Sequence, residues 1–372
     1  MKICIVTGSR AEFGILENLI KKLNKDKFFN IDLIVTGSHL SRKYGSTINE
    51  IIKSKIKINK KIKILDEKKN NFPNYISKTF IKFSKFIKTK KYEYLLILGD
   101  RSEAYCFSLA AYFNRLPIIH FHGGEVTLGS LDNFFRNSIS MMSNYHFVAT
   151  QKSKKKLINM KNSKSNIFNV GSLSLENLKN FKFLKKKHLE NEIKVKFKKK
   201  LILVNFFSES LKKDYGILNL KNLLKNLNKI KNATIIFTLS SHDNGLDKIN
   251  NIILNFVKTK NNVYVFKSLG NSKYFSLLKY ANLLIGNSSS GLIEFPFFKK
   301  PTINIGYRQS GREKASSVHS IISKKTNIYK EIIKLLNKKY SKLYNPYYKK
   351  NTSTNVIKIL KSIYVKEKNK FN

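Results

Sequence analysis

Short apolar runs recur along the chain, and many of them end at glycine or aspartate before a segment with helical periodicity. Runs of this kind are typical of strands buried on both faces of a parallel sheet with crossover helices. Strands are expected at residues 2–7, 31–36, 94–98, 117–122, 146–150, 167–170, 201–207, 234–239, 263–266, 283–285 and 302–305. Helical patterns lie between them, for example at residues 15–23 and 103–113.

The length of 372 residues is too great for one ordinary core, and 42% hydrophobic residues supply enough apolar matter for two. A lysine-dense segment near residues 175–200 interrupts the alternating pattern, which then resumes. We therefore expect an α/β chain of two doubly wound, Rossmann-like domains, with a ligand cleft between them. The expected bounds are residues 1–175 and 176–354, followed by a helix at 355–372 that packs back on the first domain.

The formal net charge of +49 raises the alternative of a nucleic-acid-binding protein. Nearly all of the 72 basic residues are lysines, however, and they are spread through the chain among asparagine and isoleucine. We interpret them as a solvated coat that reflects codon composition, and we expect no specific nucleic-acid partner. No motif of a zinc knuckle or an RNA-recognition sheet is present in the sequence.

Other features of the sequence indicate a cytoplasmic protein without a membrane partner. No apolar run approaches the roughly 18 residues of a membrane span, and residue 1 leads directly into a strand pattern without a signal-peptide layout. The two cysteines, Cys4 and Cys106, lie in separate apolar runs, which fits a reducing compartment.

Arginine is scarce, and its positions are therefore informative. Five of the seven arginines lie in or near the segments that could carry chemistry: Arg10, Arg101, Arg136, Arg308 and Arg312. Because a guanidinium offers a planar, bidentate donor where lysine is the default cation, this distribution indicates an anionic ligand.

Two candidate segments follow early strands. Residues 8–14 (GSRAEFG) form a glycine turn before a helix, where backbone N–H groups favour an anion and Arg10 adds donors. Residues 98–103 (LGDRSE) place Asp100 at the carboxyl end of a strand, beside Arg101. The first could also be an ordinary strand-to-helix turn, and Asp100 could simply cap the next helix.

The densest candidate segment is residues 120–125 (HFHGGE), followed by Asp132 and Arg136. His120 and His122, two apart on a strand, are expected to point the same way, and with Glu125 and Asp132 they are candidate general acids and bases. A metal site is an alternative for a His-x-His pattern with a carboxylate, but no further histidine stands at ligand spacing, and we expect none. A buried histidine pair beside a glycine turn is the purely structural alternative.

In the second half, residues 286–294 (GNSSSGLIE) form a serine-rich loop that follows a strand and is expected to open a helix. Its N–H groups, hydroxyls and positive helix end suit a diphosphate, and Glu294 could accept the hydroxyls of a ribose. Residues 306–313 (GYRQSGRE) follow the next strand and can bring Arg308 and Arg312 toward the same ligand. An N-capped helix after a serine loop is the structural alternative.

In order and rough spacing, these motifs resemble the hydrolysing UDP-N-acetylglucosamine 2-epimerases, especially their branch in sialic- and legionaminic-acid pathways. The resemblance runs from residue 2 to about residue 320. It implies the GT-B architecture with the sugar nucleotide in the interdomain cleft, no cofactor, and a homodimer. It also implies a reaction in which a base removes the C2 proton while UDP leaves C1. The resulting 2-acetamidoglycal is then hydrated to N-acetylmannosamine.

The resemblance also assigns roles to residues. Asp100, Glu125 and Asp132 would transfer protons and place the sugar, His120 and His122 would be further partners, and Arg136 would orient a carboxylate. The nucleotide would be bound by Arg10, Ala11, Gly14, Arg101, Ser288, Ser289, Ser290, Gly291, Glu294 and Arg308.

The chain departs from the family pattern at several positions. Phe207 stands where the family usually has a histidine near the nucleotide, and His242 could compensate for it. Asn137 replaces a common histidine, and Tyr307 replaces a smaller residue. Two further alternatives therefore stay open: the same chemistry on a UDP- or GDP-linked 2,4-diacetamido-6-deoxy sugar, and a GT-B glycosyltransferase.

Overall fold

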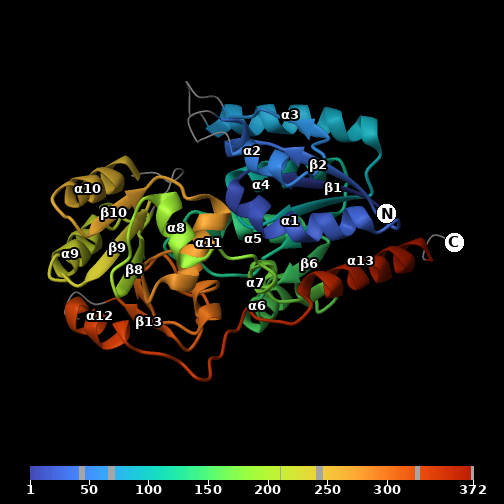
Figure 1. Cartoon of the computed structure of the whole chain (residues 1–372). Coiled ribbons are helices and arrows are strands. Elements are labelled where there is room, and N and C mark those ends of the chain that lie inside the picture. Colours follow the sequence, from blue (N-terminus) through green and yellow to red (C-terminus); the bar gives the residue numbers. More distant parts are fainter. Residues whose placement is uncertain (42–46, 66–71, 210, 240–245, 323–326, 370–372) are drawn as a thin grey trace. The chain divides into compact units, whose positions relative to one another are not determined.

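The computed structural model describes residues 1–41, 47–65, 72–209, 211–239, 246–322 and 327–369, which form two compact units (Figure 1). The first unit comprises Met1–Glu125, Asp132–Asn177 and Tyr347–Asn372, and the second comprises Val126–Leu131 and Leu178–Pro346. The chain therefore leaves one unit for the other after Glu125, Leu131, Asn177 and Pro346.

Within the described residues, the strands of the first unit form one parallel sheet in the order β3-β2-β1-β4-β5-β6-β7. The strands are β1 (Lys2–Thr7), β2 (Asn30–Val35), β3 (Lys60–Lys61), β4 (Tyr94–Leu98), β5 (Ile118–Phe121), β6 (Tyr145–Val148) and β7 (Ile167–Asn169). The helices are α1 (Arg10–Lys25), η1 (Gly37–Leu40), α2 (Ile48–Lys53), α3 (Phe72–Lys90), α4 (Ser102–Phe113), α5 (Asp132–Met142), α6 (Gln151–Lys161), α7 (Leu173–Lys179) and α13 (Thr352–Lys368).

Both faces of this sheet are buried, which explains why its strands appear as continuous apolar runs. In β1, Ile3 and Ile5 belong to one core cluster, together with residues of α1 and α13. The alternate residues Cys4 and Val6 belong to a second cluster, together with residues of α3 and α4. The period-two geometry of a strand thus divides a single run between two layers of helices.

The last helix, α13, is part of the first unit. Its Val356, Leu360 and Ile363 are buried in the core cluster beside α1. The buried Glu176 carboxylate accepts the Ser353 N–H at 2.5 Å and its hydroxyl at 2.7 Å, which holds the start of the helix. Near its end, the Glu367 carboxylate accepts the phenol hydroxyls of two strand residues, Tyr94 and Tyr145.

The second unit repeats the design with a parallel sheet in the order β10-β9-β8-β11-β12-β13. The strands are β8 (Lys200–Asn205), β9 (Ala233–Thr238), β10 (Val263–Phe266), β11 (Leu283–Gly286), β12 (Thr302–Ile305) and β13 (Val318–Ile321). The helices are α8 (Lys186–Ile193), α9 (Ile217–Leu227), α10 (Leu246–Lys258), α11 (Gly270–Tyr280), η2 (Ser289–Gly291), η3 (Phe295–Phe298) and α12 (Ile328–Leu336).

The expected fold class is confirmed: each unit is a doubly wound, Rossmann-like α/β domain, as in the GT-B class. The strand order reverses between β1 and β4 in the first unit and between β8 and β11 in the second. Ligands of such sheets bind outside the carboxyl ends of the strands at these reversal points. Most of the candidate motifs follow the strands on either side of the two reversals.

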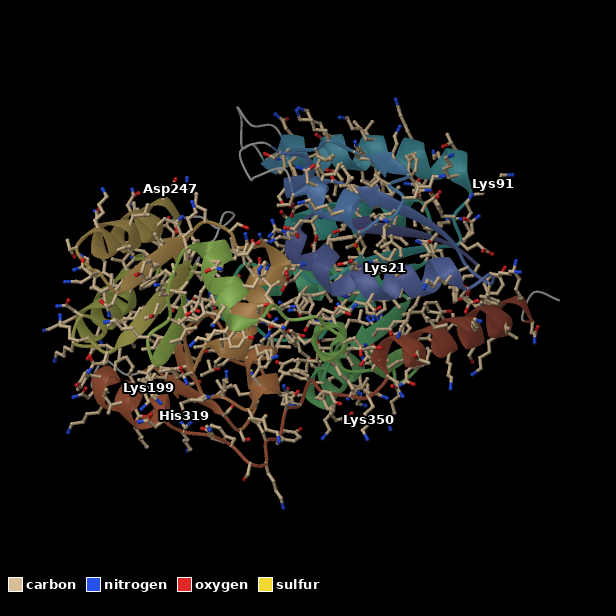
Figure 2. All side chains as sticks on the ribbon, viewed as in Figure 1. Lys21, Lys91, Lys199, Asp247, His319 and Lys350 are labelled. Atoms are coloured by element: carbon tan, nitrogen blue, oxygen red, sulfur yellow. The ribbon has the colours of Figure 1, made fainter. Side chains whose placement is uncertain are left out.

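Basic side chains project from many elements of both units (Figure 2). The labelled Lys21 lies on α1, Lys91 follows α3, Lys199 precedes β8 and Lys350 precedes α13. This distribution over both units is more typical of solvent-exposed lysines than of one basic surface that binds nucleic acid. No helix within the described ranges combines the length and apolarity that crossing a bilayer requires.

Candidate active site

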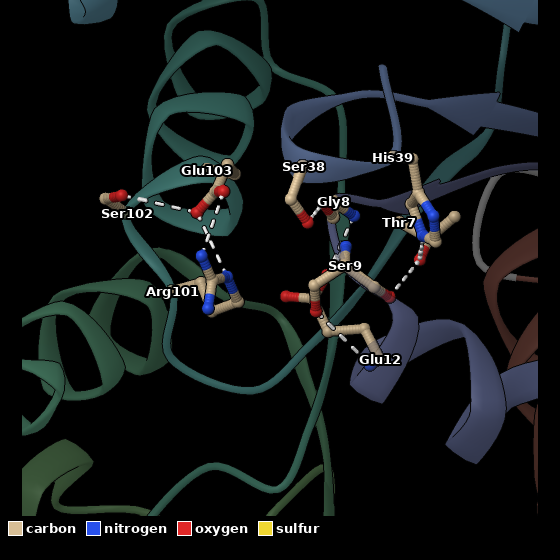
Figure 3. Close-up of polar contacts among 9 residues, drawn as sticks. All are labelled: Thr7, Gly8, Ser9, Glu12, Ser38, His39, Arg101, Ser102 and Glu103. Carbon is tan, nitrogen blue, oxygen red and sulfur yellow. Dashed lines mark hydrogen bonds and ion pairs between the residues drawn. The ribbon is translucent and has the colours of Figure 1, made fainter. Parts of the chain in front are cut away.

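The turn between β1 and α1 is closed by the protein's own carboxylate (Figure 3). Ser9 caps α1, and Oε2 of Glu12 accepts the backbone N–H groups of Gly8 at 2.7 Å and Ser9 at 2.9 Å. Two of the N–H groups in this turn are therefore satisfied inside the chain, and the predicted anion site at the start of α1 stays a prediction. The capping box S-x-x-E, visible at residues 9–12, is the signal that explains the arrangement.

The three candidate nucleotide-binding residues of this helix have different surroundings. Arg10 begins α1, and its Nη1 lies 3.9 Å from an oxygen of Glu50. Ala11 is exposed on the first turn, and the carbonyl of Gly14 accepts an N–H from the Asn177 amide at 2.9 Å. Their role in nucleotide binding stays a prediction.

Arg101 is held by the buried carboxylate of Glu103, in the first turn of α4 (Figure 3). Its Nε and Nη2 donate to the two oxygens of Glu103, at 3.2 and 3.1 Å. Burial raises the pKa of the nearby Glu12 carboxyl to about 7; Arg101 opposes this rise and Glu103 adds to it. Two buried carboxylates thus share the field of one guanidinium at the carboxyl ends of β1 and β4.

Asp100 is positioned by an arginine that is itself almost completely buried. The guanidinium of Arg136, 1% exposed, forms an ion pair with Asp100 through Nη2 and donates to the carbonyl of Glu125 through Nη1 at 3.0 Å. The Asp100 side chain keeps 23% of its surface exposed. One arginine on α5 therefore connects the loop after β4 with the loop after β5, and it leaves the carboxylate accessible.

His120 is committed to contacts inside the first unit. Its ring lies at 0% exposure, with Nε2 2.7 Å from the carbonyl of Gly99 and Nδ1 3.2 Å from the hydroxyl of Ser140. Burial lowers the pKa of His120 to about 4, so the ring is neutral near pH 7. Nε2–H must then donate to the carbonyl while Nδ1 accepts from the hydroxyl, and this histidine fixes the loop after β4.

His122 does not continue the strand, so the two histidines do not share the period-two strand geometry on which the prediction rested. The strand β5 ends at Phe121, and His122 has a left-handed φ of 61°. Its Nδ1 lies 3.4 Å from Oε1 of Glu125. Only glycine fits at position 123 of this turn, because a Cβ there would lie 2.8 Å from the Ser140 hydroxyl and 2.9 Å from Nδ1 of His120.

Asp132 begins α5, on the other side of the segment Val126–Leu131, which belongs to the second unit. Burial opposes the charge on Arg101, but the carboxylates of Glu103, Glu12 and, with the smallest effect, Asp132 raise its pKa. The first unit thus gathers Asp100, Arg101, Glu125, Asp132 and Arg136 around the carboxyl ends of β4 and β5. Among the residues that the structure describes, no group of three or more His, Cys, Asp or Glu side chains could hold a metal ion.

In the second unit, the serine loop does not open an α-helix as expected. Ser288 caps a 3₁₀ turn through its hydroxyl, which accepts the Ser290 N–H at 3.2 Å, and η2 spans only Ser289–Gly291. A second 3₁₀ turn, η3, follows Glu294. Pro296 has no backbone N–H that could continue helical hydrogen bonding from the serine loop, which favours two short turns over one longer helix. The loop therefore supplies hydroxyls and N–H groups without the dipole of a long helix.

Asn287 organises this loop, although sequence reasoning assigned it no role. Its side chain forms two hydrogen bonds with the backbone of Phe207: Oδ1 accepts the N–H at 2.7 Å and Nδ2 donates to the carbonyl at 2.8 Å. The Asn287 carbonyl accepts N–H groups from Arg308 at 3.2 Å and Gln309 at 2.9 Å. Its place directly after a strand, between Gly286 and the serines, was the available signal.

The loop that carries Arg308 is also anchored by a carboxylate with 0% exposure, that of Glu209. Its Oε1 accepts the Tyr307 N–H at 3.1 Å, and its Oε2 lies 2.6 Å from Nζ of Lys212. Gly306 has φ +82°, and a Cβ there would lie 1.9 Å from Oε1 of Glu209. His242, suggested as a compensating residue, lies outside the described residues.

Comparison with known proteins identifies the family. The family model described as UDP-N-acetylglucosamine 2-epimerase matches residues 21–361. The chain is 41% identical, over 85% of its length and 83% of the relative's, to a GDP/UDP-N,N'-diacetylbacillosamine 2-epimerase (hydrolyzing) of Campylobacter jejuni. It is 35% identical, over 99% of its length and 95% of the relative's, to polysialic acid biosynthesis protein P7 of Escherichia coli.

Solved structures agree on the fold. A UDP-GlcNAc 2-epimerase from Neisseria meningitidis bound to UDP-GlcNAc matches with a TM-score of 0.81 and 19% identity, over 97% of this chain and 100% of that one. The family match covers most of the sequence and includes nearly all of the motifs described above. The chain therefore belongs to the UDP-N-acetylglucosamine 2-epimerase family.

Proposed function

We propose that this protein is a hydrolysing 2-epimerase that acts on a nucleoside-diphosphate-linked 2-acetamido sugar. The observation that carries the proposal is the accessible carboxylate of Asp100, fixed by the buried Arg136 beside the loop of Glu125. A carboxylate placed in this way at the end of a parallel strand can act as a general base or acid. Membership of the 2-epimerase family supports the same reaction class.

In the proposed reaction, a carboxylate of the first unit removes the proton from C2 of the sugar. The C2 electron pair forms the C1–C2 double bond as the C1–O bond breaks, and the nucleoside diphosphate leaves with that bond's electrons. Water then adds its oxygen to C1, while C2 is protonated from the opposite face. The C2 proton is weakly acidic, so the base, the acid and stabilisation of the leaving group must act together.

Asp100, Glu125 and Asp132 are the groups proposed to transfer these protons. His120 is a less suitable proton carrier, because both of its ring nitrogens are engaged and its pKa is lowered to about 4. We assign it to positioning the loop after β4. His122, beside Glu125, remains a candidate partner of the sugar.

The nucleotide is proposed to bind to the second unit. Ser288, Ser289, Ser290 and Gly291 would face the diphosphate, Glu294 the ribose hydroxyls, and Arg308 the charge that develops on the leaving group. Arg10, Ala11, Gly14 and Arg101 of the first unit are the remaining candidates for contact with the nucleotide. The loop geometry around Asn287 supports this assignment, since it holds Arg308 beside the serine loop.

Two substrates fit the proposal. UDP-N-acetylglucosamine would yield N-acetylmannosamine for nonulosonic acid biosynthesis, and the relationship to the polysialic acid biosynthesis protein supports it. A UDP- or GDP-linked N,N'-diacetylbacillosamine would enter the same chemistry, and the relative with 41% identity carries that name. The higher identity favours the diacetamido sugar.

The test is incubation of the full chain with each sugar nucleotide in deuterated water, followed by NMR. The proposal predicts free sugar with inverted configuration at C2 and deuterium at that carbon, together with the nucleoside diphosphate. Free sugar that keeps its original C2 hydrogen would eliminate the mechanism. Release of nucleotide only when a sugar acceptor is added would instead indicate a glycosyltransferase.

A further inference from the structure

Phe207 lies directly after the strand β8, at the strand-order reversal of the second unit. The guanidinium carbon of Arg308 lies 5.4 Å from the centre of the Phe207 ring, within the range of a cation–π interaction. Arginine prefers such aromatic faces because its planar, weakly hydrated cation can rest on a ring while its N–H groups stay available at the edges. The Phe207 ring can therefore support a cation that must face an anionic ligand.

Phe207 lies beyond the end of β8, but both of its backbone polar groups still have hydrogen-bond partners. Its N–H and carbonyl are both bonded to the side-chain amide of Asn287. The chain after β8 and the chain after β11 can approach closely because Gly286 has no side chain. A Cβ at Gly286 would lie 1.9 Å from the carbonyl oxygen of Asn205. The Phe207 ring is thus held in place at the carboxyl end of the central strand β8.

Arg308 is fixed from the other side as well. The Asn287 carbonyl accepts its Nη1, and the buried Glu209 holds the preceding residue, Tyr307, through its backbone N–H. Asn287 therefore contacts both partners of the cation–π pair. The Phe207 ring, the Asn287 amide and the Arg308 guanidinium are therefore connected by direct contacts.

We propose that Phe207 is a positioning residue that orients Arg308 toward the diphosphate of the bound nucleotide, an inference that rests on the proposed function. The Phe207 ring has no hydrogen-bonding atoms, so it can act on the diphosphate only through the orientation that it gives to Arg308.

The test measures UDP binding to the full chain by isothermal titration calorimetry, for the wild type and for Phe207→Leu, Phe207→Met and Phe207→Tyr. Loss of the aromatic face in the Leu and Met variants should weaken UDP binding by about threefold to thirtyfold. The Tyr variant keeps the face and should retain most of the affinity. Thermal unfolding of each variant identifies any that fail to fold, and the remaining aliphatic variant then decides.

A double-mutant cycle with Arg308→Met separates positioning from a merely structural role. If Phe207 acts through Arg308, Phe207→Leu should weaken UDP binding in the wild-type background and have little further effect beside Arg308→Met. Equal weakening in both backgrounds, or unchanged affinity in both aliphatic variants, would overturn the proposal. If the wild type does not bind UDP, the same series is measured with GDP; wild-type protein that binds neither nucleotide would overturn the proposed function and this inference together.

Discussion

The two candidate sites occupy corresponding places in two similar sheets, yet they are built from different chemistry. At the reversal in the first unit, ionisable groups crowd together: Glu12, Asp100, Arg101, Glu103 and Arg136. At the reversal in the second unit, the contacts nearest the serine loop come from amides, hydroxyls and backbone groups around one guanidinium.

This difference corresponds to two tasks. Buried carboxylates next to a cation can have shifted pKa values and exchange protons, as expected of a site for proton transfer. Amides and hydroxyls hold a fixed pattern of donors over a wide pH range, as expected of a site that binds a diphosphate. Under the proposed function, the first unit would carry the proton transfers and the second would bind the nucleotide.

The largest expected effect concerns the helix α13, which stabilises only the first unit. Leu360→Ala removes a side chain that is 0% exposed in the core beside α1. We expect the free energy of unfolding of this unit to fall by about 2–5 kcal/mol, because the cavity cannot fully collapse. Denaturant unfolding with probes in each unit checks this. The matched control Lys358→Ala, an exposed position on the same helix, should change little; equal losses in both variants would contradict the assignment.

Asp100→Asn tests whether the first unit carries the chemistry. Turnover of the sugar nucleotide should fall by at least about a hundredfold, because the amide cannot accept the proton. UDP affinity, measured by calorimetry, should change far less. Glu125→Gln should behave in the same way. A large loss of UDP affinity with normal turnover would contradict this assignment, because Asp100 would then act in nucleotide binding and not in proton transfer.

The first unit should be sensitive to acid. Burial lowers the pKa of His39 and His120 to about 4 and that of His146 to about 3, against an ordinary value of 6.5. These rings stay neutral in the folded first unit but take up protons once it unfolds. The stability they contribute is therefore present above about pH 6.5 and is lost as the pH falls toward 4.

His146→Phe removes one of the rings that take up a proton on unfolding, and it approximately conserves the side-chain volume. The dependence of the first unit's unfolding free energy on pH, between pH 6.5 and 4, should become shallower by about one proton. Unfolding curves at several pH values provide the measurement. An unchanged slope would show that the buried His146 ring is not linked to acid unfolding.

Glu12 should act in the opposite direction. Burial raises its pKa to about 7, above its ordinary value of 4.5. Its contribution to stability is therefore present at acid pH and is lost as the pH rises through 7. Glu12→Gln can still accept the N–H groups of the turn, and it should flatten the pH dependence of stability between pH 5 and 8. A slope identical to that of the wild type would contradict the shifted pKa.

The smallest expected effect is that of Glu294→Ala in the second unit. If Glu294 contributes the same binding energy before and during the reaction, KM should rise severalfold while kcat stays within about twofold. Steady-state kinetics with the sugar nucleotide check this. A fall in kcat as large as that of Asp100→Asn would mean that the second unit also takes part in the chemistry.

Local sequence patterns predicted much of the fold. Strands such as β1 and β4 have continuous apolar runs, and the glycine-containing turns after them identify the sheet edge where the motifs gather. The strand β13 was missed because Val318–Ile321 is short and only partly buried, with polar residues within it. The pattern at such an edge strand differs little from that of a loop.

The site was harder to predict, because its decisive contacts join residues far apart in the sequence. Asn287 pairs with Phe207, and the ring of His120 is held by Gly99 and Ser140, contacts that depend on which strands become neighbours. The sequence motifs identified the residues but not their partners. The turn at His122 illustrates this limit, since a period-two pattern did not reveal that the strand had already ended at Phe121.

The chain passes between the two units after Glu125, Leu131, Asn177 and Pro346, so neither unit is one uninterrupted stretch of sequence. No recombination event with a single breakpoint can exchange one intact unit for that of a relative. An engineered exchange of the second unit must therefore carry Val126–Leu131 as well as Leu178–Pro346 from the same donor.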